Sequence, residues 1–393
     1  MSACGLPDPD PFATGTREGT RPASLPAVMV RTAKGSVLQR MSSEGRVQGA
    51  TSIPAGSQPV AALRNGMVVL RTSDDRAVET LSVRDSAGRS RELDVINAGL
   101  SDVALPRVVR LTGREHGRDV FHWLVLPSRS QFLPPLVVQP YPGRVYGPDR
   151  PRDAVISRYF LATNPLLLAA AGFAVLLPTL PDDTEVVNPS ERMAGDVERA
   201  VDLAAATGLF DVNRMAVMGH SFGGYAALTL ATRDTRFKAV VAANGVSDLA
   251  AFHGSMSGPD RVALEDGPPY GISAGWVEGG QGGMSALPQA DPAAYAAASP
   301  IWHVDRVRSP ILLVTGDVDQ VGPVQSERMF MELARIGADV RLARYWGEGH
   351  SVSGAGNIAD YWQLVIGFLR SRLVAPKSEA RSGAPGRIST PMR

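Results

Sequence analysis

The chain has 393 residues, of which 44% are hydrophobic and 20% are charged, with a formal net charge of +1 at pH 7. This composition is ordinary for a globular protein, and the small net charge argues against nucleic acid or an anionic membrane as a partner. Cys4 is the only cysteine, which excludes an intrachain disulfide and a thiolate metal cluster. Because no apolar run reaches transmembrane length and no histidines form a close-spaced pair on a helix, we expect no membrane span and no metal.

Both ends of the chain have the composition of flexible segments. Residues 1–26 are rich in Pro, Gly, Thr and Asp and predict a flexible tail, while residues 375–393 are rich in Pro, Ser and Arg and predict disorder. The amino terminus has no basic segment followed by an apolar stretch, so we expect no signal peptide and a cytoplasmic location. The sequence does not indicate an oligomeric state.

Residues 27–104 predict a β-rich accessory segment of short strands broken by turns. Asn65-Gly66 and Ala87-Gly88 are turn signals, and the first is a favourable hairpin dipeptide. No catalytic constellation is found in this segment. Its candidate strands lie at 60–63, 66–70 and 79–83.

Residues 105–374 predict a domain in which strands and helices alternate. An antiparallel strand pair opens it, and a later helix has Asn188 as its N-cap, Pro189 in its first turn, Glu191 in a capping box and Gly208 at its end. Alternating elements favour a doubly wound, mostly parallel sheet that is covered on both faces. The predicted strands are 108–111, 120–126, 136–138, 173–177, 215–218, 238–242, 311–314 and 340–345, the further helices are 166–171, 325–336 and 357–373, and residues 252–290 are expected to form a glycine-rich loop.

One short stretch of this domain has the pattern of a nucleophile elbow. A short apolar strand leads into the G-x-S-x-G sequence of residues 219–223, and an alanine-rich helical run follows. Gly219 and Gly223 would allow the strained turn and the close passage of helix and strand. Ser221 is therefore the candidate nucleophile, and we expect His220 beside it to be structural.

A serine nucleophile needs a general base and a group that orients the base. Because reacting groups gather at the carboxyl ends of parallel strands, we expect both partners of the serine at the ends of the later strands. The strand at 311–314 leads to Asp319, with Asp317 as its rival, and the strand at 340–345 leads to His350 between small residues. The order Ser221, Asp319, His350 is the one expected for α/β-hydrolases. Glu348 is assigned no role.

The oxyanion formed during acyl transfer requires two hydrogen-bond donors. The backbone N–H of Phe222, at the start of the helix after the nucleophile, is the first candidate. The second should come from the loop after the strand at 136–138, where Pro142 has no N–H. Either the Tyr141 hydroxyl or the Gly143 amide remains.

The glycine-rich loop at 254–283 follows the strand after the elbow, which predicts a position near the catalytic end of the sheet. Its glycines suggest a mobile cover. Tyr270 and Trp276 are the large side chains that it can present to a substrate, and Trp276 is the candidate for the substrate pocket. The alternative is an exposed loop whose aromatic residues pack on the domain.

Several segments together resemble the prolyl oligopeptidase family of serine peptidases. They are the elbow Gly-His-Ser-Phe-Gly-Gly-Tyr-Ala, the segment 299–319, the Gln325-Ser-Glu helix start and Gly347-Glu-Gly-His350. The resemblance covers about residues 105–373. It implies an α/β-hydrolase domain that cleaves peptides through an acyl-enzyme without a cofactor, with Tyr141 matching a tyrosine that often donates to the oxyanion.

The sequence departs from this family in two respects. Relatives normally carry a β-propeller before the catalytic domain, but about 100 residues do not provide four blades of roughly 40–45 residues each. We therefore expect the β-rich segment to resemble the last blade or two, and the active site to be open. Many relatives also carry Arg or Asn two residues after the triad aspartate, where this chain has Val321. That replacement places Val321 in the predicted substrate pocket and argues against specificity for proline or dipeptides.

The sequence thus predicts a serine peptidase acting on oligopeptides with Ser221, Asp319 and His350. A carboxylesterase-like hydrolase with the same triad is the alternative within this class. An inactive, truncated family member is the alternative outside it.

Overall fold

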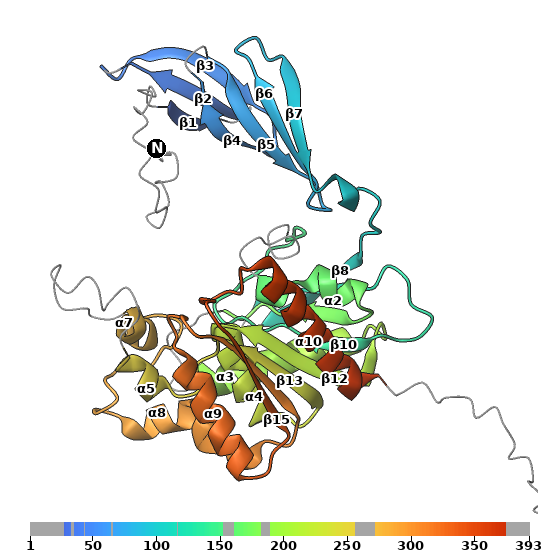
Figure 1. The fold of residues 1–393 in the computed structure, drawn as a ribbon, viewed down its shortest axis with the longest axis vertical. Helices are drawn as coiled ribbons and strands as arrows, with labels where there is room; N and C mark the ends of the chain where they lie inside the picture. Colours follow the sequence, from blue (N-terminus) through green and yellow to red (C-terminus); the bar gives the residue numbers. More distant parts are fainter. Residues whose placement is uncertain are drawn as a thin grey trace, which may run out of the picture. The chain divides into compact units, whose positions relative to one another are not determined.

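A computed structural model describes residues 27–32, 35–42, 44–63, 66–115, 117–151, 161–181, 189–255 and 272–374. The chain divides into two compact units, with the boundary along the sequence between Leu105 and Pro106, and each is described by itself (Figure 1). Both predicted tails, and the predictions made for Asn65, Asn188 and Tyr270, lie outside the described residues.

The first unit contains two antiparallel sheets with the strand orders β1-β2-β3 and β4-β5-β6-β7. Leu38, Ile53, Val68 and Leu70 form its small buried core. Gly66 lies between the paired strands β4 and β5, Gly88 lies between the paired strands β6 and β7, and both have positive φ angles, of 87° and 86°. The strands are β1 Ala27–Thr32, β2 Gly35–Met41, β3 Val47–Ile53, β4 Ser57–Ala62, β5 Val68–Ser73, β6 Glu79–Arg84 and β7 Ser90–Ile96, followed by a 3₁₀ turn, η1 Ala98–Leu100.

The second unit is built on one eight-stranded sheet with the order β15-β14-β13-β12-β10-β11-β9-β8. The six strands from β15 to β11 run parallel, while β9 and β8 add antiparallel at one edge. The predicted mostly parallel sheet is therefore confirmed. Its strands are β8 Arg107–Glu115, β9 Arg118–Leu126, β10 Pro135–Val138, β11 Ala174–Leu177, β12 Asp211–His220, β13 Phe237–Ala243, β14 Ile311–Gly316 and β15 Val340–Tyr345.

Helices cover both faces of this sheet (Figure 1). Side chains of α3, α4 and α9 share one buried cluster with the sheet, and those of α2 and α10 share the other. No helix in the described ranges is long and apolar enough to cross a bilayer. The helices are α2 Pro165–Ala170, α3 Pro189–Ala205, α4 Phe222–Ala231, α5 Leu249–His253, α7 Ile272–Gly279, α8 Pro292–Ala298, α9 Pro323–Arg335 and α10 Ala355–Leu373, with the 3₁₀ segments η2 Leu161–Thr163 and η4 Pro300–Arg306.

The alternation of side chains along β12 explains how its apolar run fits this arrangement. Met215 and Val217 belong to the cluster on one face, and Ala216 and Met218 belong to the cluster on the other. Because successive residues of a strand point to opposite faces, a continuous apolar run is buried only when both faces are covered. β12 therefore lies in the middle of the sheet and brings Ser221 to its carboxyl edge.

The prediction of a loop over residues 252–290 is wrong for part of that segment. Residues 272–279 form α7, in which Ser273 and Val277 are fully buried one turn apart. Gly275 and Gly279 lower the intrinsic helix propensity, but burial of one face outweighs it. Residues 256–271 lie outside the described residues.

Candidate active site

Ser221 lies at the sharp turn between β12 and α4, with φ 58° and ψ −123°. A non-glycine residue rarely adopts a positive φ, so the turn is strained and is held by its surroundings. The N–H of Ser221 donates to the carbonyl of Ala243 on the adjacent strand, at 2.9 Å. A Cβ atom at Gly219 would lie 1.9 Å from the Gly223 carbonyl oxygen. Glycine at 219 is therefore a steric requirement of the turn.

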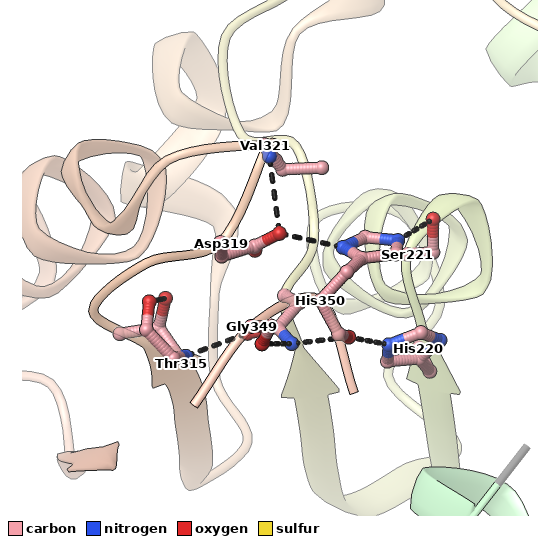
Figure 2. A network of polar contacts seen from close by, with 9 residues as sticks. His220, Ser221, Thr315, Asp319, Val321, Gly349 and His350 are labelled. Carbon is pink, nitrogen blue, oxygen red and sulfur yellow. Dashed lines mark hydrogen bonds and ion pairs between the residues drawn. The ribbon is translucent and has the colours of Figure 1, made fainter. Parts of the chain in front are cut away.

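Three side chains form a hydrogen-bonded row at the carboxyl edge of the sheet (Figure 2). The Nε2 atom of His350 lies 2.8 Å from Ser221 Oγ, and its Nδ1 atom lies 2.7 Å from Asp319 Oδ1. A carboxylate can only accept, so Nδ1 carries the proton and Nε2 is left to accept from the serine hydroxyl. This is the tautomer that a general base for Ser221 requires.

Asp319 is held rigidly and Asp317 is directed elsewhere. The Asp319 side chain is completely buried, and its Oδ1 also accepts from the N–H of Val321 at 3.1 Å. Asp317 accepts instead from the N–H of Gly347 at 2.5 Å. The structure therefore brings Asp319 to the imidazole of His350, whereas Asp317 supports the loop that precedes this histidine.

Glu348, to which the sequence assigned no role, is an anchor for the loop that carries His350. Its buried carboxylate accepts from Ser353 N–H and Oγ–H at 2.7 and 2.9 Å, from Gly354 N–H at 2.9 Å and from Asn357 Nδ2 at 2.7 Å. Burial alone would raise the pKa of Glu348, but the hydrogen bonds outweigh burial and lower it from its ordinary value. Glu348 is thus held as a carboxylate that ties the loop to the start of α10.

Two buried side chains bind the main-chain carbonyl of His350. His220 donates from Nε2, and Asn244 donates from Nδ2 at 2.6 Å, while Asn244 Oδ1 accepts from Gly316 N–H at 3.0 Å. Sequence reasoning expected a structural His220 but missed Asn244. Asn244 directly follows β13 and has a φ of 47°. Asparagine tolerates this conformation better than most residues, so an asparagine after a predicted strand was the only local signal in the sequence.

The Nδ1 atom of His220 has no hydrogen-bond partner among the described residues. Its ring centroid lies 4.7 Å from that of His350. Burial, and then the neighbouring His350, lower the pKa of His220 from 6.5 to about 4. His220 is therefore neutral near pH 7.

One candidate oxyanion donor lies in the elbow and the others lie on a neighbouring loop. Phe222 is the first residue of α4, where a backbone N–H has no acceptor within the helix. The N–H of Gly143, one of two candidates on the opposite loop, donates to the Leu180 carbonyl at 2.8 Å. The Tyr141 ring lies beside the elbow: a Cβ atom added at Gly223 would be 3.4 Å from this ring. Because the Gly143 N–H already donates to Leu180, we keep the Tyr141 hydroxyl as the candidate for the second donor.

A separate apolar cluster adjoins the elbow. Trp276 of α7 meets the Phe222 ring edge-on, with ring centroids 4.7 Å apart and an interplanar angle of 88°. Val321 is buried in the same cluster. Both predicted pocket residues therefore lie in the apolar cluster of the residue that follows Ser221. The buried members are Phe222, Tyr225, Val246, Leu249, Phe252, Val277, Tyr295, Ala298 and Val321.

Within the described ranges, no three His, Cys, Asp or Glu side chains are arranged to hold a metal ion. Every polar contact of the candidate site is made by side chains and backbone groups of the second unit. A mostly parallel sheet with a serine at the turn after β12, an aspartate after β14 and a histidine after β15 defines an α/β-hydrolase.

Residues 188–374 match the model of the prolyl oligopeptidase family, in agreement with the resemblance found in the sequence. It is similar to the acylamino-acid-releasing enzyme of Rattus norvegicus, with 27% identity over 63% of this chain and 32% of that protein. It is also similar to the uncharacterised peptidase YuxL of Bacillus subtilis, with 27% identity over 65% of this chain and 37% of that protein. The chain thus spans about a third of the length of these curated relatives.

Solved structures show the same fold. An acylaminoacyl peptidase of Pyrococcus horikoshii aligns with a TM-score of 0.59 and 16% identity, covering 91% of this chain and 55% of the other. A puromycin-hydrolysing peptidase of Mycobacterium tuberculosis aligns with a TM-score of 0.61 and 21% identity, covering 88% and 52%.

Proposed function

We propose that this chain is a serine peptidase that hydrolyses peptide bonds through an acyl-enzyme. The observation that carries the proposal is the row of Ser221, His350 and Asp319, with contacts of 2.8 and 2.7 Å. The match to the family model and the names of the relatives support amide bonds, rather than other bonds, as the target.

The proposed reaction begins when His350 Nε2 takes the proton of Ser221 and Oγ attacks the substrate carbonyl carbon. Asp319 holds the imidazole and stabilises its positive charge. The tetrahedral oxyanion is met by the N–H of Phe222 and by the hydroxyl of Tyr141. The imidazolium then protonates the leaving amine, and a water activated by His350 hydrolyses the acyl-serine.

The apolar cluster around Phe222 supports a preference for substrates with an apolar side chain next to the scissile bond. In this proposal Trp276 and Val321 contribute to the wall of the substrate pocket. The peptide is the expected partner, and the cytoplasmic location stays a prediction of the sequence that cell fractionation tests.

The test is hydrolysis of short N-acylated chromogenic peptide amides and of a small activated ester by three proteins: wild type, Ser221→Ala and His350→Ala. The proposal predicts cleavage of the amides by the wild type and nearly complete loss in both variants, with unchanged unfolding temperatures. Cleavage of the ester alone would replace the peptidase by the esterase alternative. No cleavage of either substrate by folded wild type would favour an inactive family member.

A further inference from the structure

The turn that follows α7 is linked by hydrogen bonds to the loop that carries Tyr141. The indole Nε1–H of Trp276 donates to Gln281 Oε1 at 3.0 Å, and Gln281 Nε2 donates to the Pro142 carbonyl at 2.8 Å. An indole N–H can only donate and a carbonyl can only accept, so both contacts require the same orientation of the Gln281 amide. The carboxamide is therefore fixed at both of its ends.

The backbone around Gln281 is held as closely as its side chain. The N–H of Gly282 donates to the Trp276 carbonyl at 3.1 Å, and the N–H of Met284 donates to the Val277 carbonyl at 3.0 Å. A Cβ at Gly282 would lie 2.6 Å from Val277 Cα. This glycine allows the turn to lie directly against α7, so it makes a close contact rather than a flexible segment.

The two ends of this link reach the two candidate oxyanion donors. At one end, Pro142 directly follows Tyr141. At the other end, the ring of Trp276 meets the ring of Phe222, whose N–H is the second donor, with centroids 4.7 Å apart. The link thus connects two elements that are far apart in the sequence and that flank Ser221.

The loop of Tyr141 is also attached by backbone hydrogen bonds next to Pro142. The N–H of Gly143 donates to Leu180, at 2.8 Å, and the N–H of Leu180 donates to Arg144, also at 2.8 Å. These bonds tie the loop to the segment after β11. Gln281 ties the same loop from the side of α7, so that its removal takes away this hydrogen bond to the loop.

We propose that Gln281, oriented by Trp276, is a positioning residue that holds the Tyr141 loop at the place where the tyrosine hydroxyl meets the oxyanion. The inference rests on the proposed function, and Gln281 itself touches no reacting atom. Donors that stabilise a developing charge act best when their position is fixed beforehand. A displacement of about 1 Å can lower a rate on the order of 10²-fold.

The test is a double-mutant cycle on the rate at which a fluorophosphonate probe modifies Ser221, because this reaction requires no knowledge of the natural substrate. Tyr141→Phe alone is expected to lower the second-order rate constant by roughly 10²–10³. Gln281→Leu should lower it about tenfold or more in the wild type and cause no further loss in the Tyr141→Phe background. Gln281→Glu keeps an acceptor for Trp276 but loses the donor to Pro142, so it should resemble Gln281→Leu.

Two controls separate positioning from a general structural defect. Gln289→Leu, at an exposed position of the same segment, should leave the rate unchanged. With a chromogenic peptide, Gln281→Leu should lower kcat while KM is retained, which a loosened substrate pocket would not produce.

An equal loss from Gln281→Leu in both tyrosine backgrounds, or no loss in either, would overturn the inference while leaving the triad intact. If the proposed function itself is wrong, the experiment gives a different result: wild type and Ser221→Ala would then react with the probe at the same rate. That outcome would overturn the inference as well.

Discussion

Two histidines lie side by side at the site, and their neighbours give them different tasks. His350 is placed between a serine hydroxyl and a buried carboxylate, so that its ring can exchange a proton. His220 donates to the backbone carbonyl of His350 and stays neutral because burial lowers its pKa to about 4. In the proposed function His350 therefore serves the reaction, and His220 supports the position of His350.

The carboxylate of the triad gives a prediction at the same scale. Asp319→Asn should lower turnover by on the order of 10⁴, because an asparagine amide can stabilise the wrong tautomer of His350. Asp317→Asn should have a small effect, since its amide oxygen can still accept from Gly347 N–H. Steady-state rates of both variants with one substrate make the comparison. A damaging Asp317→Asn with a mild Asp319→Asn would reverse the assignment.

The lowered pKa of His220 predicts how the free energy of unfolding depends on pH. Its folded pKa of about 4 lies below its ordinary value of 6.5, so the unfolded state binds the extra proton first as the pH falls. The stability that this difference contributes is complete above pH 6.5 and is lost as the pH falls towards 4. The loss amounts to ~3 kcal/mol. Denaturant unfolding measured across this range provides the value.

His220→Gln is the matched control, because it keeps a donor near the Nε2 position but does not titrate. Its stability should fall less steeply between pH 6.5 and 4 than that of the wild type. His350 and Asp319, the titratable groups beside His220, are retained in both proteins. Parallel curves for the two proteins would show that His220 is not buried in a neutral form.

At the scale of elements, the elbow was predictable and α7 was not. The strand, the small residues and the helix around Ser221 are adjacent in the sequence, and the order of Ser221, Asp319 and His350 follows from the ends of successive strands. The helical character of α7 depends instead on the burial of Ser273 and Val277, which share one face of this glycine-containing helix. Such contacts come from distant residues and leave little periodicity in a segment of eight residues.

Asn244, Glu348 and Gln281 illustrate the same limit at the candidate site. Each supports a loop through hydrogen bonds to backbone groups, and polar residues of this kind are common in any loop. The amide oxygen of Asn244, for example, meets Gly316, 72 positions later in the chain. Only the arrangement of the strands brings such pairs together. The contacts among Ser221, His350 and Asp319 could be predicted from the chemistry of these residues, but their supporting residues could not.

The position of α7 leads to a prediction about selectivity. Trp276→Ala should lower kcat/KM more for a peptide with an apolar residue at the scissile bond than for a small activated ester, because only the former uses the proposed pocket wall. Trp276→Phe keeps an aromatic ring and should preserve most of the preference. Specificity constants for the two substrates, measured with both variants, test the pocket. Equal losses for both substrates would discard it.

At the scale of the whole molecule, the described residues of the first unit form one three-stranded and one four-stranded sheet. A closed propeller takes at least about four blades. The 393-residue chain by itself is therefore expected to cleave an unfolded protein as well as a short peptide. Comparison of the two substrates by gel and by chromogenic assay tests this. Refusal of the unfolded protein by an active monomer would show that another element restricts access.

The central claim is that Ser221 is a nucleophile activated by His350, and covalent labelling tests it most directly. The protein is treated with a fluorophosphonate, and the modified residue is located by mass spectrometry of its peptides. We predict one adduct on Ser221 in the wild type, none in Ser221→Ala and greatly slowed labelling in His350→Ala. An adduct on another residue, or equal labelling of wild type and Ser221→Ala, would contradict the account.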